Sequence, residues 1–413
     1  MHLRNALLIV LSCLLLSSSC PCHAAPASLN IRDFGALGNG IADDTGAIVS
    51  AIAKAKSESL PVYVPRGRYI VTKTIDVDGV AIQGDSSNAW PADIDSLPQI
   101  LAQKMDGPCF QISAGGSIRG LGIDYIWPRN SDKGPAAILV TGGGVYLSNL
   151  RIRYAYDGII TDAVHNVGRL NIENVFMASI QHEGVRVTGT LDIPRLCNVE
   201  VWNNGEWKDS LDHGTGFHLG RNDGMRMTDC FAFAMQTAFL FEAVGATDDT
   251  KGVTLGQMNG CSSDYCGHGV VVHGDHMLSI GGCTFWSHGA GLIVDGAGAQ
   301  LQMANCELHS NGGPDVQVLA ATDVVITGCS LFRPMKEYPG PAVELKGGTV
   351  VLGSNYMDCF GNGVEVGDAV TSANITGNTI MSRGGKSIVG PSGASFNFAG
   401  NISLSKTPAL SDQ

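Results

Sequence analysis

The feature that most constrains the fold is a pattern that recurs about every two dozen residues from residue 145 onward. Each unit contains an alternating apolar segment, a position held by Asn or Cys, a second short apolar segment, and a segment of the form Gly-apolar-x-apolar. The Asn or Cys position is filled in turn by Asn149, Asn174, Asn198, Cys230, Cys261, Cys283, Cys306, Cys329, Asn355, Asn378 and Asn401. A unit of three short period-2 segments cannot bury an apolar face by itself, so the units must stack and share one core.

The repeat predicts an all-β fold, a right-handed parallel β-helix solenoid in which each unit closes one coil. Equivalent residues of neighbouring coils then lie ~4.8 Å apart, the spacing of paired strands. At that spacing inward Asn side chains form a hydrogen-bonded ladder, and small Cys side chains fill the same position in the middle coils. We therefore expect the five cysteines of this column to be unpaired. Disulfides, which are common in exported proteins, are the alternative.

The first 25 residues have the pattern of a secretory signal peptide. Arg4 supplies the positive start, Ala6–Leu16 is a short apolar run, and small residues follow around Ala25. The run is too short for a stable membrane span. We therefore expect a secreted or periplasmic protein whose residues 26–413 form a single domain, because no linker-like segment interrupts them. The formal net charge of −12 argues against a nucleic-acid partner.

The segment that precedes the repeats has a different character. Asp33-Phe-Gly-Ala, Gly38-Asn-Gly and Asp43-Asp-Thr are followed by a predicted amphipathic helix over Gly46–Ser57, and then by Val64-Pro-Arg-Gly-Arg-Tyr. An open solenoid end exposes core and strand edges, so we expect residues 26–75 to form an N-terminal cap and the first strands. We expect Asp44 or Thr45 to cap the helix.

In this order, the motifs resemble the opening of the pectate-lyase-like, rhamnogalacturonase/epimerase-type β-helix superfamily. The resemblance implies the solenoid fold and a polysaccharide ligand. It leaves the chemistry open, because members of the superfamily include lyases, hydrolases, epimerases and phage tailspike depolymerases. The matching segment is the cap, so its acidic pair, Asp43 and Asp44, is expected to be structural.

The Gly-apolar-x-apolar segments are expected to form one long parallel sheet whose alternate residues face outward. Glu242, His273 and Asp295 then occupy one outward position in three successive coils. Two coil steps separate the two carboxylates by roughly 9–10 Å at the backbone, and inverting glycoside hydrolysis uses carboxyl groups ~6.5–9.5 Å apart. We predict that Glu242 and Asp295 are a catalytic pair and that His273 tunes them or contacts a sugar hydroxyl. The alternative is an ordinary solvated face.

Residues predicted to bind substrate are Arg186, His218, Trp202, Trp207 and Lys346. The two tryptophans belong to an insertion after Asn198 and suit stacking on the apolar face of a sugar ring, or anchoring of the loop. In a lyase or epimerase, His218 would instead remove a proton and Arg186 would neutralise a uronate carboxylate.

Two further groups of residues precede the outward strands. Asp157, His182, Glu183 and Asp264 are expected to be ordinary solvated loop residues. The second group is interpreted as polar lining of a groove, with a metal site as the alternative; its members are Tyr265, Cys266, His268, His288 and His309.

The sequence thus favours an exported polysaccharide-active protein, with acid/base hydrolysis through Glu242 and Asp295 as the leading reaction. A lyase or epimerase acting on a uronate-containing glycan is the first alternative, and a non-catalytic glycan-binding or exopolysaccharide-assembly protein is the second. Hydrolysis of this kind needs no cofactor and no metal site, whereas a lyase could use Ca²⁺.

Overall fold

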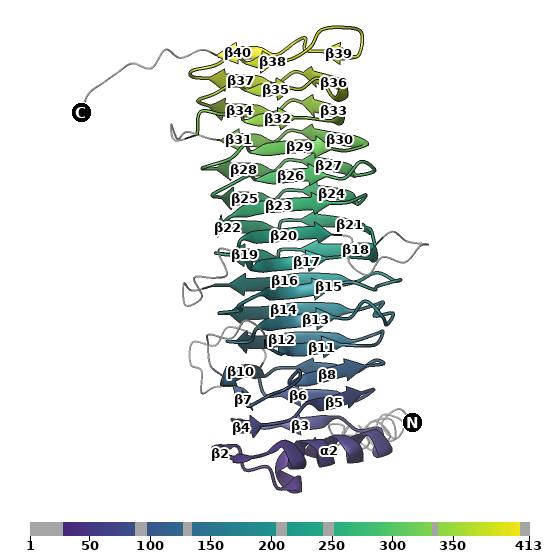
Figure 1. Cartoon of the computed structure of the whole chain (residues 1–413). Helices are drawn as coiled ribbons and strands as arrows, with labels where there is room; N and C mark the ends of the chain where they lie inside the picture. The colour runs from purple at the N-terminus through teal and green to yellow at the C-terminus, as the bar shows by residue number, and fades with distance from the viewer. Residues whose placement is uncertain are drawn as a thin grey trace, which may run out of the picture.

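The computed structural model describes residues 28–86, 97–126, 134–203, 213–242, 252–332 and 338–404. Figure 1 shows one continuous stack of coils with helix α2 (Thr45–Glu58) against its N-terminal end. The predicted all-β, right-handed parallel β-helix is confirmed. The predicted signal peptide, residues 1–25, lies outside the described residues. Within these residues, no helix combines the length and the apolar character needed to cross a membrane.

The Gly-apolar-x-apolar segments form a 13-stranded sheet, as expected. All its neighbouring strands pair in parallel, one strand per coil, so equivalent residues stack along the helix axis. The strands are β5 (Ile75–Asp78), β8 (Phe110–Ser113), β11 (Ala136–Val140), β13 (Asp157–Thr161), β15 (Glu183–Val187), β17 (Thr215–Leu219), β20 (Thr237–Glu242), β23 (His268–His273), β26 (Leu292–Asp295), β29 (Val316–Ala320), β32 (Val343–Leu345), β35 (Val364–Val366) and β38 (Ile388–Val389).

The other two sides of each coil belong to a 27-stranded sheet with two parallel rows. The first row contains β1 (Leu29–Asn30), β3 (Val62–Val64), β6 (Ala81–Gly84), β9 (Ser117–Arg119), β18 (Asn222–Thr228), β21 (Thr254–Asn259), β24 (Met277–Gly281), β27 (Gln300–Ala304), β30 (Asp323–Thr327), β33 (Gly348–Gly353), β36 (Val370–Thr376) and β39 (Phe396–Asn397). The second row contains β2 (Asn39–Asp43), β4 (Gly67–Val71), β7 (Pro98–Gln103), β10 (Gly122–Ile126), β19 (Phe231–Phe233), β22 (Ser262–Cys266), β25 (Thr284–Ser287), β28 (Glu307–Ser310), β31 (Ser330–Phe332), β34 (Tyr356–Cys359), β37 (Thr379–Ser382) and β40 (Ile402–Leu404). Three long strands run through both rows and join them: β12 (Tyr146–Arg153), β14 (Asn171–Ala178) and β16 (Arg195–Trp202).

The predicted column of cysteines lies at the corner between the two rows. The backbone N–H of Cys283 points at the Sγ atom of Cys306, and that of Cys306 points at Cys329 Sγ, each at 3.4 Å. The ladder continues with Asn355 and Asn378, because the backbone N–H of Asn355 donates to Asn378 Oδ1 at 2.9 Å. All nine cysteines of the described residues are free, so the disulfide alternative is wrong for them.

The predicted column is wrong by one residue for Asn149, Asn174 and Asn198. These three side chains are not inward members of the ladder, because they adopt the left-handed backbone conformation with φ between 50° and 52°. The strand register aligns Asn198 with Asp229, since their neighbours Cys197 and Glu200 pair with Thr228 and Phe231. Asn tolerates the left-handed region better than most residues, which explains its use at this bend.

The N-terminal cap agrees with the predicted cap and places both acidic residues in structural roles. Helix α2 begins one residue earlier and ends one residue later than predicted. The Asp44 carboxylate does not cap the helix but accepts the backbone N–H groups of Leu37 and Gly38, at 2.7 and 3.2 Å. Asp43 instead accepts the backbone N–H of Thr45, at 3.0 Å.

Aromatic rings fill the interior behind the middle coils. Phe217 and Phe239, on β17 and β20, are fully buried and stack with ring centroids 5.0 Å apart. Phe285 meets Phe239 edge-to-face at 5.9 Å. This packing gives the outward residues of β17 and β20 a rigid support.

Candidate functional site

The 13-stranded sheet aligns the predicted catalytic residues along the helix axis. Glu242 pairs in register with His273, and His273 pairs with Asp295. The three side chains are about half exposed, with exposed fractions of 46–48%. His273 Nδ1 lies 3.8 Å from Asp295 Oδ2, so these two groups interact across one coil step. The predicted alignment is confirmed, and the catalytic roles of these residues stay a prediction.

A buried His–carboxylate pair lies behind this row. His218 Nδ1 lies 2.6 Å from Glu183 Oε1, and both side chains are less than 10% exposed. An ionised carboxylate only accepts hydrogen bonds, so His218 must carry a proton on Nδ1 to make this contact. Glu183 therefore fixes both the orientation and the tautomer of the imidazole.

The other imidazole nitrogen faces a predicted catalytic residue. His218 Nε2 lies 3.3 Å from Glu242 Oε2, although the two groups are not aligned as a hydrogen bond. The result is a line of three groups on successive strands of the sheet: buried Glu183, buried His218 and half-exposed Glu242. Only the last of the three presents a large part of its side chain to the solvent.

The charge on Glu183 is stabilised from two sides. Burial alone would raise the pKa of Glu183, but the hydrogen bond with His218 and the positive charge of Arg186 outweigh burial and lower it. Arg186 Nη1 lies 3.0 Å from Glu183 Oε2. The carboxylate thus stays ionised in a site that water scarcely reaches.

Arg186 and His218 are neighbours as well as partners of Glu183. They pair in register on β15 and β17, and the Arg186 side chain keeps 32% of its surface exposed. The two predicted substrate-binding residues therefore belong to the same cluster as Glu242. Arg186 remains accessible from outside, whereas His218 does not.

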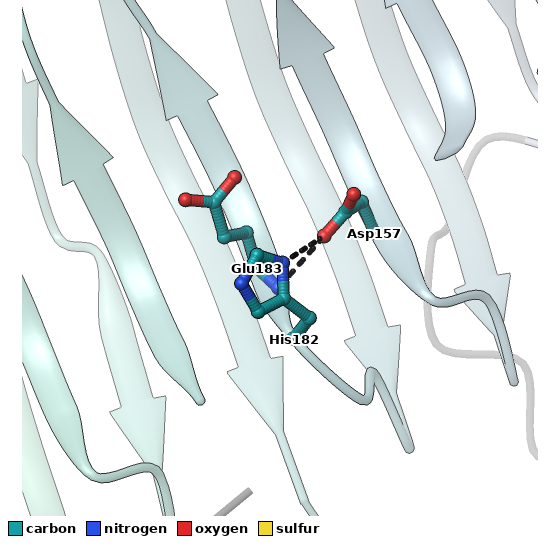
Figure 2. Close-up of side chains that lie close together, drawn as sticks. All are labelled: Asp157, His182 and Glu183. Carbon is teal, nitrogen blue, oxygen red and sulfur yellow. Dashed lines mark hydrogen bonds and ion pairs between the residues drawn. The ribbon is translucent and has the colours of Figure 1, made fainter. Parts of the chain in front are cut away.

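A second His–carboxylate pair lies one coil toward the N-terminus. His182 Nδ1 lies 2.9 Å from Asp157 Oδ1, which also accepts the backbone N–H of Glu183 (Figure 2). The hydrogen bond to Asp157 raises the pKa of His182, and burial offsets part of that rise. Tyr156 stacks on the His182 ring with centroids 5.0 Å apart.

Asp157, His182 and Glu183 offer ligand atoms within 4.8 Å of one another, a spacing that a metal ion could use. The Glu183 carboxylate, however, points away from Asp157 in Figure 2 and is bound by Arg186 and His218. A cation here would compete with a guanidinium group for the same carboxylate. Hydrogen bonds and the charge of Arg186 account for the contacts of both carboxylates.

The expectation of ordinary solvated loop residues is wrong for Asp157 and Glu183. Glu183 is 5% exposed and lies at the start of strand β15, and Asp157 begins strand β13. The sequence shows a Glu directly before the Gly of a recurring strand pattern, but the partner that buries it, His218, comes from the next coil. Pairing of β15 with β17 brings them together.

Two further predicted binding residues, Trp202 and Lys346, lie apart from this cluster. Trp202 is half-buried, packs against Phe176 and Ala178, and meets Phe233 at 5.6 Å, so it anchors the strand end more than it faces the solvent. Lys346 forms an exposed ion pair with Glu344 at 3.0 Å, several coils away. Trp207 lies outside the described residues.

The cluster has the components of acid/base chemistry. Glu242 is an accessible carboxyl group, and His218 behind it is held by the ionised Glu183 carboxylate. Asp295 provides a second accessible carboxylate two strands away, with His273 between them. Such a row can deliver a proton to one side of a bound molecule and activate water on another.

Comparisons with known proteins agree with the fold. Residues 28–104 match the family model described as rhamnogalacturonase A/epimerase, pectate lyase-like, and residues 268–405 match the right-handed β-helix region. No curated protein sequence matches the chain.

Solved structures of similar shape include the A-module of mannuronan C-5 epimerase AlgE6 from Azotobacter vinelandii, with 17% identity over 91% of this chain and 99% of that one, at a TM-score of 0.57. A double mutant of the tailspike protein of E. coli bacteriophage HK620 is 10% identical over 92% of this chain and 78% of that one, at a TM-score of 0.61. The catalytic domain of a GH87 α-1,3-glucanase in complex with nigerose is 14% identical over 86% of this chain and 70% of that one, at a TM-score of 0.58. At these identities the likeness is one of fold.

Proposed function

Because the chain belongs to the right-handed parallel β-helix superfamily, we propose that it is an exported polysaccharide-active enzyme that hydrolyses glycosidic bonds. The similar structures include a mannuronan epimerase and a glucanase, which supports a glycan as the ligand. Export rests on the sequence pattern of the first 25 residues.

The observation on which this proposal depends is the line Glu183–His218–Glu242. A carboxyl group that acts as a general acid must hold a proton near neutral pH and recover it after each turnover. His218 Nε2 lies 3.3 Å from Glu242 Oε2 and is shielded from solvent, so it serves as the proton partner of Glu242. Glu183, through Nδ1, keeps the imidazole in the orientation that this role needs.

In the proposed reaction Glu242 protonates the glycosidic oxygen and Asp295 activates a water molecule. Equivalent positions two strands apart are separated by roughly 9–10 Å at the backbone. The reaction requires the Glu242 side chain, which contacts His218 on the other side of β20, to turn toward Asp295, so that the two carboxyl groups come within the ~6.5–9.5 Å range of inverting hydrolases and leave room for the water. His273 lies between them and would orient Asp295, whose Oδ2 is 3.8 Å from its Nδ1.

The test is digestion of a broad panel of polysaccharides, with reducing ends and absorbance in the near ultraviolet measured in parallel. Wild-type protein is expected to release reducing ends without ultraviolet absorbance. The variant Glu242→Gln is expected to bind the same glycan and to lose about 10²–10⁴-fold in cleavage rate, the usual contribution of a general acid. Glu365→Gln is the matched control, because Glu365 lies on the same sheet, on β35, and bonds only locally to Asn362.

A second candidate is a lyase or epimerase acting on a uronate-containing glycan, because Arg186 lies beside His218 in register and is partly exposed. The Arg186 guanidinium would neutralise the uronate carboxylate, and His218 would remove the proton from the carbon next to that carboxylate. The same panel separates hydrolysis from the lyase reaction. Ultraviolet-absorbing product from a uronate polymer, lost in Arg186→Gln, would favour the lyase and contradict hydrolysis.

A further inference from the structure

A row of aromatic rings follows the helix axis on the second row of the 27-stranded sheet. Trp202, Phe233 and Tyr265 come from three successive coils, with ring centroids 5.6 and 6.1 Å apart. On the next two strands Trp286 stacks on His309 at 4.4 Å, with an angle of 26° between the ring planes. We call these five residues the aromatic ladder. Figure 1 shows its strands, from β16 and β19 to β28, one above another along one side of the stack.

The middle of the ladder faces the solvent. Tyr265 is 52% exposed and Trp286 is 49% exposed, which places them among the most exposed aromatic side chains of the described residues. His288 is also exposed and meets Tyr265 edge-to-face at 4.4 Å. Exposed aromatic surface that continues over several coils is typical of an interaction site, whereas single exposed apolar residues are not.

The sequence-based interpretation of Tyr265, His288 and His309 as polar lining of the groove is therefore corrected. Their rings pack on aromatic neighbours and form an aromatic surface of two groups, Tyr265 with Phe233 and His288, and His309 with Trp286. That surface lies before the N-terminal ends of the strands of the 13-stranded sheet, whereas Glu242 lies at a C-terminal end. Strand β23, with six residues, separates the two edges, by about 17–20 Å at ~3.3 Å per residue.

The charge of the ladder strands limits which ligand fits. In the second row of the described ladder strands β16, β19, β22, β25 and β28 the carboxylates are Glu200, Asp264 and Glu307, and there is no Lys or Arg, since Arg195 of β16 pairs in the first row. Asp264 is exposed, and Glu307 is 51% exposed and lies 2.5 Å from His309 Nε2. Such a rim repels polyanions, and its carboxylates accept hydrogen bonds from hydroxyl groups.

We propose that the aromatic ladder is a second glycan-binding surface, separate from the catalytic row, that holds an uncharged polysaccharide lying along the helix axis. The apolar faces of successive sugar rings stack on Tyr265 and Trp286, and sugar hydroxyls donate to Asp264 and Glu307. The ring-to-ring repeat of the ladder, set by coil stacking, suits a linear polymer better than a compact ligand. The inference names an uncharged glycan and does not depend on which residue cleaves it.

The test is affinity electrophoresis in gels that contain soluble neutral glucan or galactomannan, with alginate and polygalacturonate as anionic polymers. Glu242→Gln serves as the host so that the polymer stays intact during the run. We expect retardation by at least one neutral polymer, and about a tenfold loss of affinity for each of Trp286→Ala and Tyr265→Ala. Tyr146→Ala is the matched control, because Tyr146 is an exposed aromatic, 38% exposed, that starts β12 in line with the first row.

Several results would overturn the inference. They are equal binding by the ladder variants and the host, tighter binding of alginate than of every neutral polymer, and no retardation by any neutral polymer. Sedimentation of the host tests whether a second copy of this chain covers the ladder instead. Self-association that Trp286→Ala abolishes would also overturn it. Loss of binding in the ladder variants supports the second glycan-binding surface even if wild-type protein cleaves none of the polymers. A failure of the binding proposal can therefore be told apart from a failure of the proposed hydrolysis.

Discussion

Acidification is expected to destabilise the protein through one buried histidine. His276 is fully buried, accepts the backbone N–H of Thr254 on Nδ1 at 2.8 Å, and donates from Nε2 to the carbonyl oxygen of His273 at 3.0 Å. Both contacts require the neutral imidazole with its proton on Nε2. Burial is the main reason that the pKa of His276 falls from 6.5 to about 4.

The depressed pKa gives the sign and the size of the effect. The unfolded chain binds the proton near pH 6.5 and the folded chain only near pH 4, so the contribution of His276 to stability is complete above 6.5 and is lost as the pH falls toward 4. The difference between the pKa values of His276 in the unfolded chain, 6.5, and in the folded chain, about 4, corresponds to roughly 3 kcal/mol of unfolding free energy at pH 4. Protonation would also disrupt the turn that follows His273 on β23.

The assay is urea unfolding followed by circular dichroism at several pH values between 7 and 4. Wild-type protein should lose about 3 kcal/mol more than His276→Gln over this interval, because the amide of Gln offers one acceptor and one donor but does not titrate. His288→Gln is the control, because the His288 side chain is exposed. Equal losses in wild type and His276→Gln would show that protonation of His276 does not cause the loss of stability.

Three further outcomes are expected. Asn378→Ala should lower the unfolding free energy by roughly 2–4 kcal/mol in urea titrations, because the buried carbonyl of Leu352 and N–H of Asn355 lose their partner, whereas exposed Asn397→Ala should change it by less than about 0.5 kcal/mol. A reductant should leave the unfolding midpoint unchanged, and of the thiols of the described residues only Cys197, the exposed one, should react with a thiol reagent before unfolding; a reductant-sensitive midpoint would contradict the free-thiol ladder. Glu183→Gln should lower kcat/KM by roughly 100-fold and displace the pH–rate profile, because His218 loses the carboxylate that orients it; an unchanged profile would show that the buried pair is only structural.

The coils and their register were predictable because each coil contains the same series of elements in the same order. An apolar face, a bend and a short outward strand recur in each repeat. Alignment of the repeats therefore places Glu242, His273 and Asp295 on neighbouring strands. The structure confirms that register. The helix of the cap was predictable to one residue at each end, because a Gly-to-Ser stretch with apolar periodicity follows the acidic pair Asp43 and Asp44.

The error in the asparagine column has a local cause. Asn serves two purposes at the same corner: in Asn149, Asn174 and Asn198 it takes the left-handed backbone conformation, and in Asn355 and Asn378 it fills the inward position one residue later. In the later coils Gly or another residue takes the bend, as Ser354 does before Asn355. Sequence alone offers no sign that separates these roles, because both place an Asn between two apolar segments.

The buried pair was missed because burial of a charge depends on a partner in another coil. Glu183 precedes a strand and looks like a loop residue until pairing of β15 with β17 brings His218 to 2.6 Å. Trp202 was expected to face a sugar ring, but Phe176 and Phe233 from the neighbouring coils partly cover it. Vertical contacts between coils, rather than local patterns, decide both cases.

The proposed catalysis depends on two carboxylates, Glu242 and Asp295, that lie two strands apart with room for a water molecule between them. Proton NMR of a glycan digest in its first minutes, before the sugar product mutarotates, tests that claim most directly. With Glu242 as acid and Asp295 as base, the new reducing end first appears with the anomeric configuration opposite to that of the cleaved bond. A first product that retains the configuration would require a covalent intermediate on closely spaced carboxylates and would contradict the roles given to Glu242 and Asp295.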